Sequence, residues 1–509
     1  MQVTLILIVL CGWVFARPES AQEELDVAKN VIFFLGDGMS VPTLAGTRVY
    51  YGGEEKELSF EKLPYLALSK TYCVDAQTAD SACSATAYLG GVKNNIGTIG
   101  VTAAVERYDC DAMLLEENQV LSVARCPRTP AKEPESSPPP PSPMPLPPLL
   151  PPFFFFLSFN SSSVAGAYAH TANRSWQTDA TVEEAGKNAT ACRDIAYQLV
   201  KWDTGKKFNV ILGGGSQKFL PTGTTDSLGN SGQRTDNLNL IDEWLNDRTE
   251  EGNVAEYVWN RTALLNIGDD TDYVLGLFSG SSMSYNLDRN TTLTPSLEEM
   301  TEIAINVASK GEGAENGYFL FIEGGRIDHA HHAVRAQKSF DETVEFAKAI
   351  QKALDVTDEE ETLIVVTADH AHTMSISGYP DRNHSIFGSP GTDGNGLTRL
   401  TINYANGPGF IASGYDYEND TTTDINYRFP SVSYRSSETH GADDVTIHAN
   451  GPWAHLFSGV MEQNVIPHIV AYASCVGDGL TACSGALKIV TALNLPVLLS
   501  VLTLHLITA

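Results

Sequence analysis

Strand-length runs of apolar residues recur along this chain, and each run gives way to glycine or to an acidic residue. Four such segments are NVIFFLGDGMS, FNVILGGGS, YFLFIEGG and ETLIVVTADH, which begin at residues 30, 208, 318 and 361. Because the runs do not alternate with polar residues, they predict parallel strands buried on both faces. Helical patterns lie between them, at residues 297–310 and 338–354. This alternation predicts an α/β fold, a three-layer α/β/α sandwich around a large, mostly parallel central sheet.

Candidate catalytic groups follow the carboxyl ends of these predicted strands. Asp37 follows the first run, Glu323 ends the third, and Asp369 with His370 directly follows the fourth. In open α/β sheets, ligands bind just beyond the carboxyl ends of the strands. An aspartate between two glycines, such as Asp37, is by itself often only a turn residue. Taken together, the four side chains predict one shared site.

The segment IEGGRIDHAHH, residues 322–332, contains two carboxylates and three histidines. Asp328 and His332 are four positions apart, so on a helix they share one face. A carboxylate and an imidazole on one face suit zinc. His329 and His331 cannot point the same way, and we interpret them as supporting or solvated side chains. A chance cluster of charges in a turn is the alternative interpretation of the segment.

Two further residues suit the binding of a phosphate group. Ser81 opens a run of small residues in TADSACSATAYLGGVK, where a helix N-terminus would direct amide donors and a dipole toward an anion. An ordinary helix cap is the alternative role for Ser81. Arg174 in AYAHTANRSW carries a fork of donors that fits two phosphate oxygens, and a plain surface arginine is its alternative.

Residues 126–163 form a stretch without helical or strand periodicity. It contains PPPPSPMPLPPLLPP followed by FFFF, and the proline run favours an extended segment without internal hydrogen bonds. Pro, Phe, Ser and Leu have codons rich in pyrimidines, as does the tract that precedes a splice acceptor. We therefore interpret residues 126–163 as an aberrant, disordered insert that derives from a retained intron. A genuine proline-rich linker is the alternative.

Composition and the terminal segments indicate the secretory route. The 509 residues carry a formal net charge of −29, which makes nucleic acid and anionic membranes poor electrostatic partners. Residues 1–16 have the apolar character of a signal peptide. Small residues ahead of an apolar tail, residues 487–509, favour a GPI-anchor signal over a membrane span. Glycosylation sequons fit this secretory route and begin at Asn188, Asn260, Asn290, Asn383 and Asn419.

Eight cysteines are present, and the secretory route permits disulfides. The plausible pairs are Cys110 with Cys192 and Cys475 with Cys483. We expect Cys73 and Cys83 to be free, buried thiols.

Taken in order, these motifs resemble those of animal alkaline phosphatases of the GPI-anchored, insect-like type. The matching segments are GDGM, DSA…ATAYLGGVK, AGAYAHTANR, EGGRIDHAHH, TADHAH and SSETH. The resemblance covers nearly all of residues 31–475 except the proline-rich stretch, and it is the set of motifs in this order that is specific. It implies a catalytic domain over residues 25–475, a small irregular crown insertion at residues 378–436, and a homodimer.

The resemblance also implies a site with two zinc ions and one magnesium ion, which hydrolyses phosphate monoesters through a phosphoserine intermediate. Ser81 is the implied nucleophile, and Arg174 is implied to clamp the phosphoryl oxygens. The implied ligands of the first zinc are Asp328, His332 and His440. Those of the second zinc are Asp37, Asp369 and His370, and those of magnesium are Asp37, Glu323 and Ser163.

The proline-rich stretch departs from the family pattern. It replaces a helix end and a strand, and Ser161 stands where the family has a histidine near the magnesium ion. Loss of an interior strand would leave backbone groups of the sheet without partners. A catalytically impaired, GPI-anchored surface glycoprotein that binds a partner is therefore the alternative function. A phosphodiesterase or a sulfatase with a related metal site is a third hypothesis.

Overall fold

The structure is a computed structural model that describes residues 27–125, 153–157 and 162–476. The predicted signal peptide, residues 1–16, and the predicted anchor signal, residues 487–509, lie outside the described residues. Within the described ranges, no helix combines the length and the apolarity that crossing a membrane requires.

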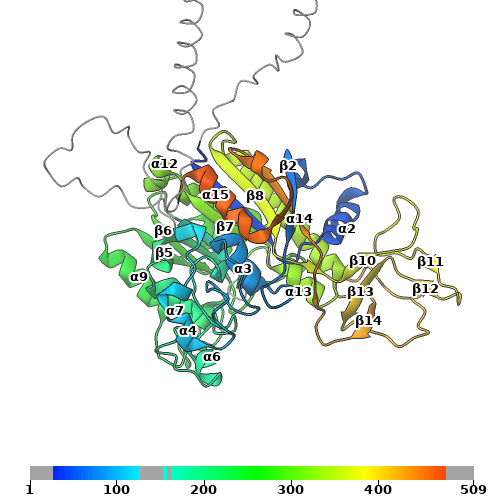
Figure 1. The fold of residues 1–509 in the computed structure, drawn as a ribbon, viewed down its shortest axis with the longest axis horizontal. Helices are drawn as coiled ribbons and strands as arrows, with labels where there is room; N and C mark the ends of the chain where they lie inside the picture. The colour runs from blue at the N-terminus through cyan, green and yellow to red at the C-terminus, as the bar shows by residue number, and fades with distance from the viewer. Residues whose placement is uncertain (1–26, 126–152, 158–161, 477–509) are drawn as a thin grey trace, which may run out of the picture.

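A ten-stranded sheet forms the middle layer of the molecule (Figure 1). Its strands are β1 Asn30–Gly36, β2 Tyr65–Lys70, β3 Phe153–Leu157, β4 Phe208–Gly213, β5 Ala255–Val258, β6 Tyr273–Leu277, β7 Phe319–Glu323, β8 Thr362–Ala368, β16 Val445–Asn450 and β17 Gly459–Glu462. The order is β17-β2-β16-β8-β1-β7-β3-β4-β6-β5. All neighbours run parallel except β16, which is antiparallel to β2 and to β8. The predicted large, mostly parallel sheet is therefore confirmed.

Helices cover both faces of the sheet. The helices of the described residues are α2 Val41–Gly52, α3 Ser81–Gly90, α4 Cys110–Met113, α5 Ser162–Ala165, α6 Asp179–Glu184, α7 Ile195–Lys201, α8 Ser216–Phe219, α9 Leu240–Glu250, α10 Arg261–Leu265, α11 Leu297–Ala308, α12 Glu312–Asn316, α13 Arg326–His332, α14 Ala336–Val356 and α15 Ile466–Ser474. Successive residues of β1 point into two different cores. Phe33 packs in a core with α3 and α15, and Phe34 packs in a core with α11 and α14. This two-sided burial is why β1 is apolar throughout.

Strand β3 corrects one expectation about the proline-rich stretch. We expected residues 126–163 to be disordered and to leave the sheet without an interior strand. Instead, Phe153–Leu157 pairs in parallel with β7 on one side and with β4 on the other. Phenylalanine favours strands, and the backbone of β3 supplies the hydrogen-bonding groups that its two neighbours need. The phenylalanine run thus occupies an interior position of the sheet.

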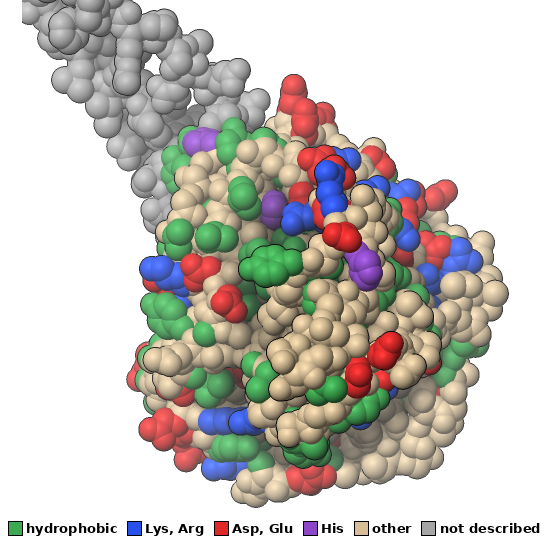
Figure 2. Space-filling model, turned by 90° about the vertical axis from the view of Figure 1, so that its right-hand side faces the viewer, with side chains coloured by type: hydrophobic (Ala, Val, Ile, Leu, Met, Phe, Trp, Pro, Cys, Tyr) green, Lys and Arg blue, Asp and Glu red, His purple; other side chains and the backbone are tan. Residues whose placement is uncertain are grey.

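The crown segment, residues 378–436, is largely irregular and contributes no strand to the ten-stranded sheet. It supplies β13 Ile402–Gly407 and β14 Ser431–Tyr434 to a three-stranded sheet with β10 Met374–Ile376, and it holds the short pair β11 Gly391–Thr392 and β12 Thr398–Arg399. Figure 1 shows these elements projecting from one side of the molecule. Figure 2 views the molecule from that side, where exposed hydrophobic side chains are scattered among charged ones.

The disulfides confirm one cysteine prediction and overturn another. Cys110 and Cys192 are joined, as predicted. Cys73 and Cys83 are also joined, so the prediction of free thiols was wrong. The fold brings their Cα atoms to 5.9 Å, a separation that suits a disulfide. Cys475 is disulfide-bonded as well, and its predicted partner Cys483 lies outside the described residues.

Candidate metal centre

The site lies beyond the carboxyl ends of three adjacent strands, β8, β1 and β7. The register places Leu35 of β1 beside Glu323 of β7 and beside Thr367 of β8, so the three strands end at the same level. Loops and short elements then bring in the remaining side chains. The predicted acidic residues and His370 are all buried, with exposed fractions of 4% for Asp37, 5% for Glu323, 6% for Asp328, 0% for Asp369 and 0% for His370.

One cluster consists of Asp37, Asp369 and His370. His370 Nε2 lies 3.2 Å from Asp369 Oδ2 and 3.6 Å from Asp37 Oδ1. His370 Nδ1 lies 3.2 Å from the carbonyl oxygen of Ala371. Because a carbonyl oxygen only accepts, Nδ1 carries the proton and Nε2 turns its lone pair toward the two carboxylates. Burial and the nearby His440 keep the pKa of His370 well below its usual value, so the ring is neutral.

The carboxylates of this cluster repel one another. Burial and the Asp369 charge raise the pKa of Asp37 well above its usual value. Asp37 Oδ1 and Asp369 Oδ2 are buried and have no hydrogen-bond partner among the described residues. Asp369 Oδ1, by contrast, accepts from the backbone N–H of Gly38 at 2.8 Å and of His370 at 2.9 Å. A divalent cation bound by Asp37 Oδ1, Asp369 Oδ2 and His370 Nε2 would relieve the repulsion, and this donor set suits zinc.

A second cluster consists of Asp328, His332 and His440. The predicted helix is present, and His332 Nε2 lies 3.3 Å from Asp328 Oδ1 along it. His440 Nε2 lies 3.3 Å from the same oxygen and 3.1 Å from His332 Nε2. The Nδ1 atoms donate to backbone carbonyls, that of His332 to Glu438 at 2.6 Å and that of His440 to Ala79 at 2.8 Å. Three electron-pair donors therefore converge, an arrangement that a bound zinc ion makes favourable.

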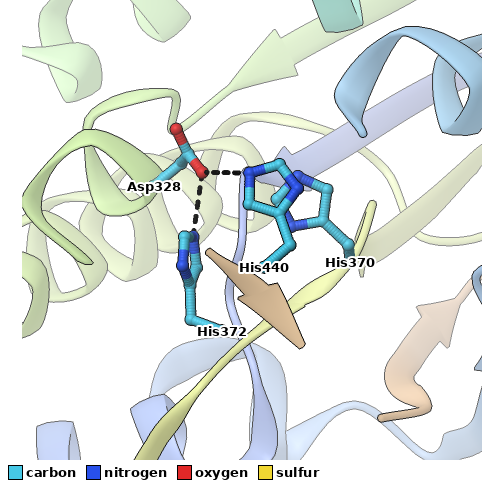
Figure 3. Close-up of side chains that lie close together, drawn as sticks. All are labelled: Asp328, His370, His372 and His440. Carbon is cyan, nitrogen blue, oxygen red and sulfur yellow. Dashed lines mark hydrogen bonds and ion pairs between the residues drawn. The ribbon is translucent and has the colours of Figure 1, made fainter. Parts of the chain in front are cut away.

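His372 and Glu438 support the second cluster, and neither was predicted from the sequence. His372 Nε2 lies 2.8 Å from Asp328 Oδ1, and its Nδ1 lies 2.6 Å from Glu438 Oε2. Burial alone would lower the pKa of His372, but Glu438 and Asp328 outweigh it and raise the pKa to about 10. Although His372 lies within ligand distance of the cluster (Figure 3), its ring nitrogens both donate, so it orients Asp328 instead of binding a metal.

The pairing of two short strands explains how His440 reaches the site. Strand β15 His440–Gly441 pairs antiparallel with β9 Ala371–His372, which sets His440 opposite His372. The rings of His440 and His370 also stack, with centroids 3.5 Å apart. The sequence signals that could have identified His372 and Glu438 are the second histidine of TADHAH and the glutamate of SSETH.

The predicted magnesium ligands are only partly described. Glu323 ends β7, and its charge is one of those that raise the pKa of Asp37, so the two carboxylates interact. Ser163 lies in α5, which packs against α3 and β7. The Ser163 side chain lies outside what the structure describes, and so does Ser161.

Ser81 is the first residue of α3 and is not its cap. Asp80 takes the capping role, because its Oδ1 accepts from the backbone N–H of Cys83 at 3.1 Å. The Ser81 hydroxyl instead lies 3.2 Å from His370 Nε2. Arg174 is held beside it by a contact of 2.9 Å between Arg174 Nη1 and Asp80 Oδ2. A hydroxyl, a helix N-terminus and a guanidinium therefore meet next to both clusters.

A largely parallel α/β sheet that ends in two carboxylate–histidine clusters beside a helix-borne serine is the arrangement of a metal-dependent hydrolase. The sequence model of the alkaline phosphatase family matches residues 28–132 and 158–476. The chain belongs to this family.

Individual relatives agree with this assignment. The chain is 43% identical over 495 residues to a membrane-bound alkaline phosphatase of Bombyx mori, an alignment that covers 94% of this chain and 86% of the relative. It is 40% identical over 480 residues to the human tissue-nonspecific alkaline phosphatase, covering 91% of this chain and 86% of the relative. Among solved structures, the alkaline phosphatase from the Antarctic bacterium TAB5 shares the fold, with a TM-score of 0.57, 18% identity, and coverage of 88% of this chain and 99% of that one.

Proposed function

We propose that this protein is an alkaline phosphatase that hydrolyses phosphate monoesters to an alcohol and phosphate. The observation that carries the proposal is the convergence of two sets of electron-pair donors beside the Ser81 hydroxyl, which lies 3.2 Å from His370 Nε2. Membership of the alkaline phosphatase family supports it.

Two zinc ions and one magnesium ion are the proposed cofactors. Asp328, His332 and His440 would hold one zinc, and Asp37, Asp369 and His370 would hold the other. Asp37 and Glu323 would hold magnesium, together with Ser163. When bound, these ions supply positive charge for the attacking and leaving oxygens of an in-line displacement.

The residues of the chain then account for the remaining chemistry. The Ser81 hydroxyl gives up its proton and its oxygen attacks phosphorus, the bond from phosphorus to the alcohol oxygen breaks, that oxygen takes up a proton, and a phosphoserine forms. Water attacks the same phosphorus in a second step, which frees phosphate and restores the Ser81 hydroxyl. The amide donors at the start of α3 and the guanidinium of Arg174 hold the non-bridging oxygens. Because these contacts all go to the phosphoryl group, we expect a broad range of alcohols to be accepted.

The test compares the turnover of p-nitrophenyl phosphate with that of bis(p-nitrophenyl) phosphate. A monoesterase with a catalytic Ser81 cleaves the monoester far faster, loses the activity on chelation and regains it when zinc is added. Faster cleavage of the diester, or activity that survives complete metal removal, would contradict the proposal. One ground for the alternative of an impaired surface glycoprotein was a lost interior strand, and β3 occupies that position in the sheet. The other ground, Ser161 in place of the family's histidine, lies outside the described residues.

We also propose that the protein is a secreted, glycosylated homodimer attached to the extracellular face of the plasma membrane by a GPI anchor. The relative from Bombyx mori is named membrane-bound, and strand β14 of the crown segment exposes Val432 and Tyr434 at 76% and 68%, which a second copy would cover. Release from cells by a phosphatidylinositol-specific phospholipase C tests the anchor. Light scattering on the purified protein tests the dimer.

The retained-intron interpretation of the proline-rich stretch remains a proposal. The family model leaves residues 133–157 unmatched, as expected if this segment does not derive from the family's coding sequence. Strand β3 lies within the unmatched segment. Sequencing the transcript across Val123 to Ala165 tests it. A spliced message that lacks the proline codons supports an intron, and a continuous message that encodes them contradicts it.

A further inference from the structure

The disulfide between Cys73 and Cys83 closes a loop that carries the proposed nucleophile. Cys73 follows the end of β2, Cys83 lies in the first turn of α3, and Ser81 lies inside the closed loop. The two cysteines are each 2% exposed and pack with Ala79 in a small core of their own. The bond therefore ties the beginning of α3 to the end of β2.

Three parts of the proposed site are attached to the end of this loop. The carbonyl oxygen of Ala79 accepts from His440 Nδ1 at 2.8 Å and so directs His440 Nε2 toward its cluster. The carboxylate of Asp80 holds Arg174 at 2.9 Å. Ser81 follows directly and carries the hydroxyl. A shift of the loop would move a zinc ligand, the phosphate-binding arginine and the nucleophile together.

Few hydrogen bonds attach the middle of the loop to the rest of the described chain. Val74 and Asp75 are exposed, and each makes a hydrogen bond to residues 94–96, from Val74 N to the Asn94 carbonyl and from Ile96 N to Asp75 Oδ1. Such hydrogen bonds contribute little net stability, because the same groups can bond to water instead. The disulfide is a covalent bond, so it limits the separation of its two ends in every conformation of the loop. The disulfide thus adds a covalent constraint to these hydrogen bonds and to the one from the backbone N–H of Gly97 to Asp80 Oδ1 at 3.1 Å.

We propose that the Cys73–Cys83 disulfide is a positioning element for catalysis, which holds Ala79, Asp80 and Ser81 in register with both metal clusters. The proposal rests on the function proposed above. Its consequence is that loss of the disulfide weakens phosphate binding and turnover beyond its effect on overall stability. The cysteines do not touch the substrate and act only through the residues between them.

The test compares two double variants with the wild-type holoenzyme. In Cys73→Ser/Cys83→Ser the loop is open. In the matched control, Cys110→Ser/Cys192→Ser, the other described disulfide is lost. For each protein the measurements are Tm, kcat and KM for p-nitrophenyl phosphate, bound zinc, and the inhibition constant of inorganic phosphate.

We expect the loop variant to lose about tenfold or more in kcat/KM and to bind inorganic phosphate about tenfold more weakly. The Cys110–Cys192 disulfide spans 82 residues against 10 for Cys73–Cys83, so we expect the control to lose at least as much Tm as the loop variant, and to keep its phosphate inhibition constant within about twofold of wild type. A loop variant whose kcat/KM and phosphate inhibition constant both stay within about twofold of wild type would overturn the proposal while leaving the proposed function intact. A zinc-loaded wild type that does not turn over would overturn the proposed function and this inference with it.

A second measurement covers the case in which the loop variant does not fold. Folded wild-type enzyme is reduced with a phosphine in zinc-saturated buffer, and the freed thiols are alkylated in an aliquot and assigned by mass spectrometry. Weaker phosphate inhibition that appears as Cys73 and Cys83 become free, and that reverses on reoxidation, supports the proposal. Unchanged inhibition with both thiols free would overturn it.

Discussion

Replacing Asp369 by asparagine should stabilise the metal-free protein and reduce the stabilisation that zinc provides. Asp369 Oδ1 accepts two backbone N–H groups, from Gly38 at 2.8 Å and from His370 at 2.9 Å, and the asparagine carbonyl can retain both. Only Oδ2 changes in character. It is buried, it lies 3.2 Å from His370 Nε2, and it faces the carboxylate of Asp37. An amide NH₂ in its place can donate to the His370 lone pair and removes one negative charge from the cluster.

The structure allows the two effects to be given rough sizes. Relief of a buried, unsatisfied charged acceptor is worth about 1–3 kcal/mol. With an unfolding entropy of about 1 kcal/mol/K for a chain of this length, the metal-free variant should melt about 1–3 °C higher than metal-free wild type. Loss of one of three protein ligands should weaken zinc binding by at least about 100-fold, or about 2.7 kcal/mol, so saturation with zinc should raise Tm less in the variant than in wild type.

The assay is calorimetry of wild type and variant, each after dialysis against dipicolinate and again after zinc saturation. Asp194→Asn is the matched control, because the Asp194 carboxylate is also buried but pairs with Arg234 through two contacts of 3.0 Å. We expect Asp194→Asn to lower Tm by the same amount with and without zinc. If Asp369→Asn behaves like this control, Asp369 Oδ2 makes a structural contact and the metal assignment is wrong.

Three further predictions test other parts of the account. Ser81→Ala should lose at least about 10³-fold in kcat while it still binds zinc and inorganic phosphate, as measured by metal analysis and calorimetric titration; full turnover would exclude Ser81 as the nucleophile. Arg174→Ala should raise the inhibition constant of phosphate by about 10–100-fold, because a charge-assisted hydrogen bond of about 1.5–3 kcal/mol is lost; an unchanged constant would show that Arg174 only supports Asp80. Burial raises the pKa of Glu342 to about 8 from 4.5, so its folded-state pKa lies above its unfolded one. It therefore stabilises the fold most below about pH 4.5, and this stability is lost as the pH rises to about 8. The stability of Glu342→Gln relative to wild type should therefore increase between these pH values, by up to about 5 kcal/mol. Urea unfolding measures this difference in stability, and a difference that does not change with pH would contradict the prediction.

The sequence was sufficient to predict the sheet and to predict that most residues of the candidate site lie close together, because both depend on local patterns. The apolar runs correctly predicted β1, β4, β7 and β8. The acids and histidines that follow these strands meet because neighbouring parallel strands end at the same level. The spacing of Asp328 and His332 predicted a shared helix face, and the two side chains do meet on α13.

Other features depend on contacts between distant segments, which no local pattern specifies. TADHAH contains two histidines, whose roles depend on their hydrogen-bond partners. His370 directs a lone pair toward carboxylates, whereas His372 donates to Asp328 and Glu438. The distance of 5.9 Å between the Cα atoms of Cys73 and Cys83 is set by how α3 packs, so their disulfide was missed. The pairing of β3 likewise depends on β7 and β4, two strands from distant parts of the sequence between which β3 lies. The composition of the proline-rich stretch does not reveal this position.

The central claim is that two divalent ions bind beside Ser81, and anomalous diffraction at the zinc absorption edge tests it most directly. In crystals of zinc-saturated, active protein, one peak should lie between Asp37, Asp369 and His370 and another between Asp328, His332 and His440. Active crystals that lack anomalous density at these two positions would contradict the account.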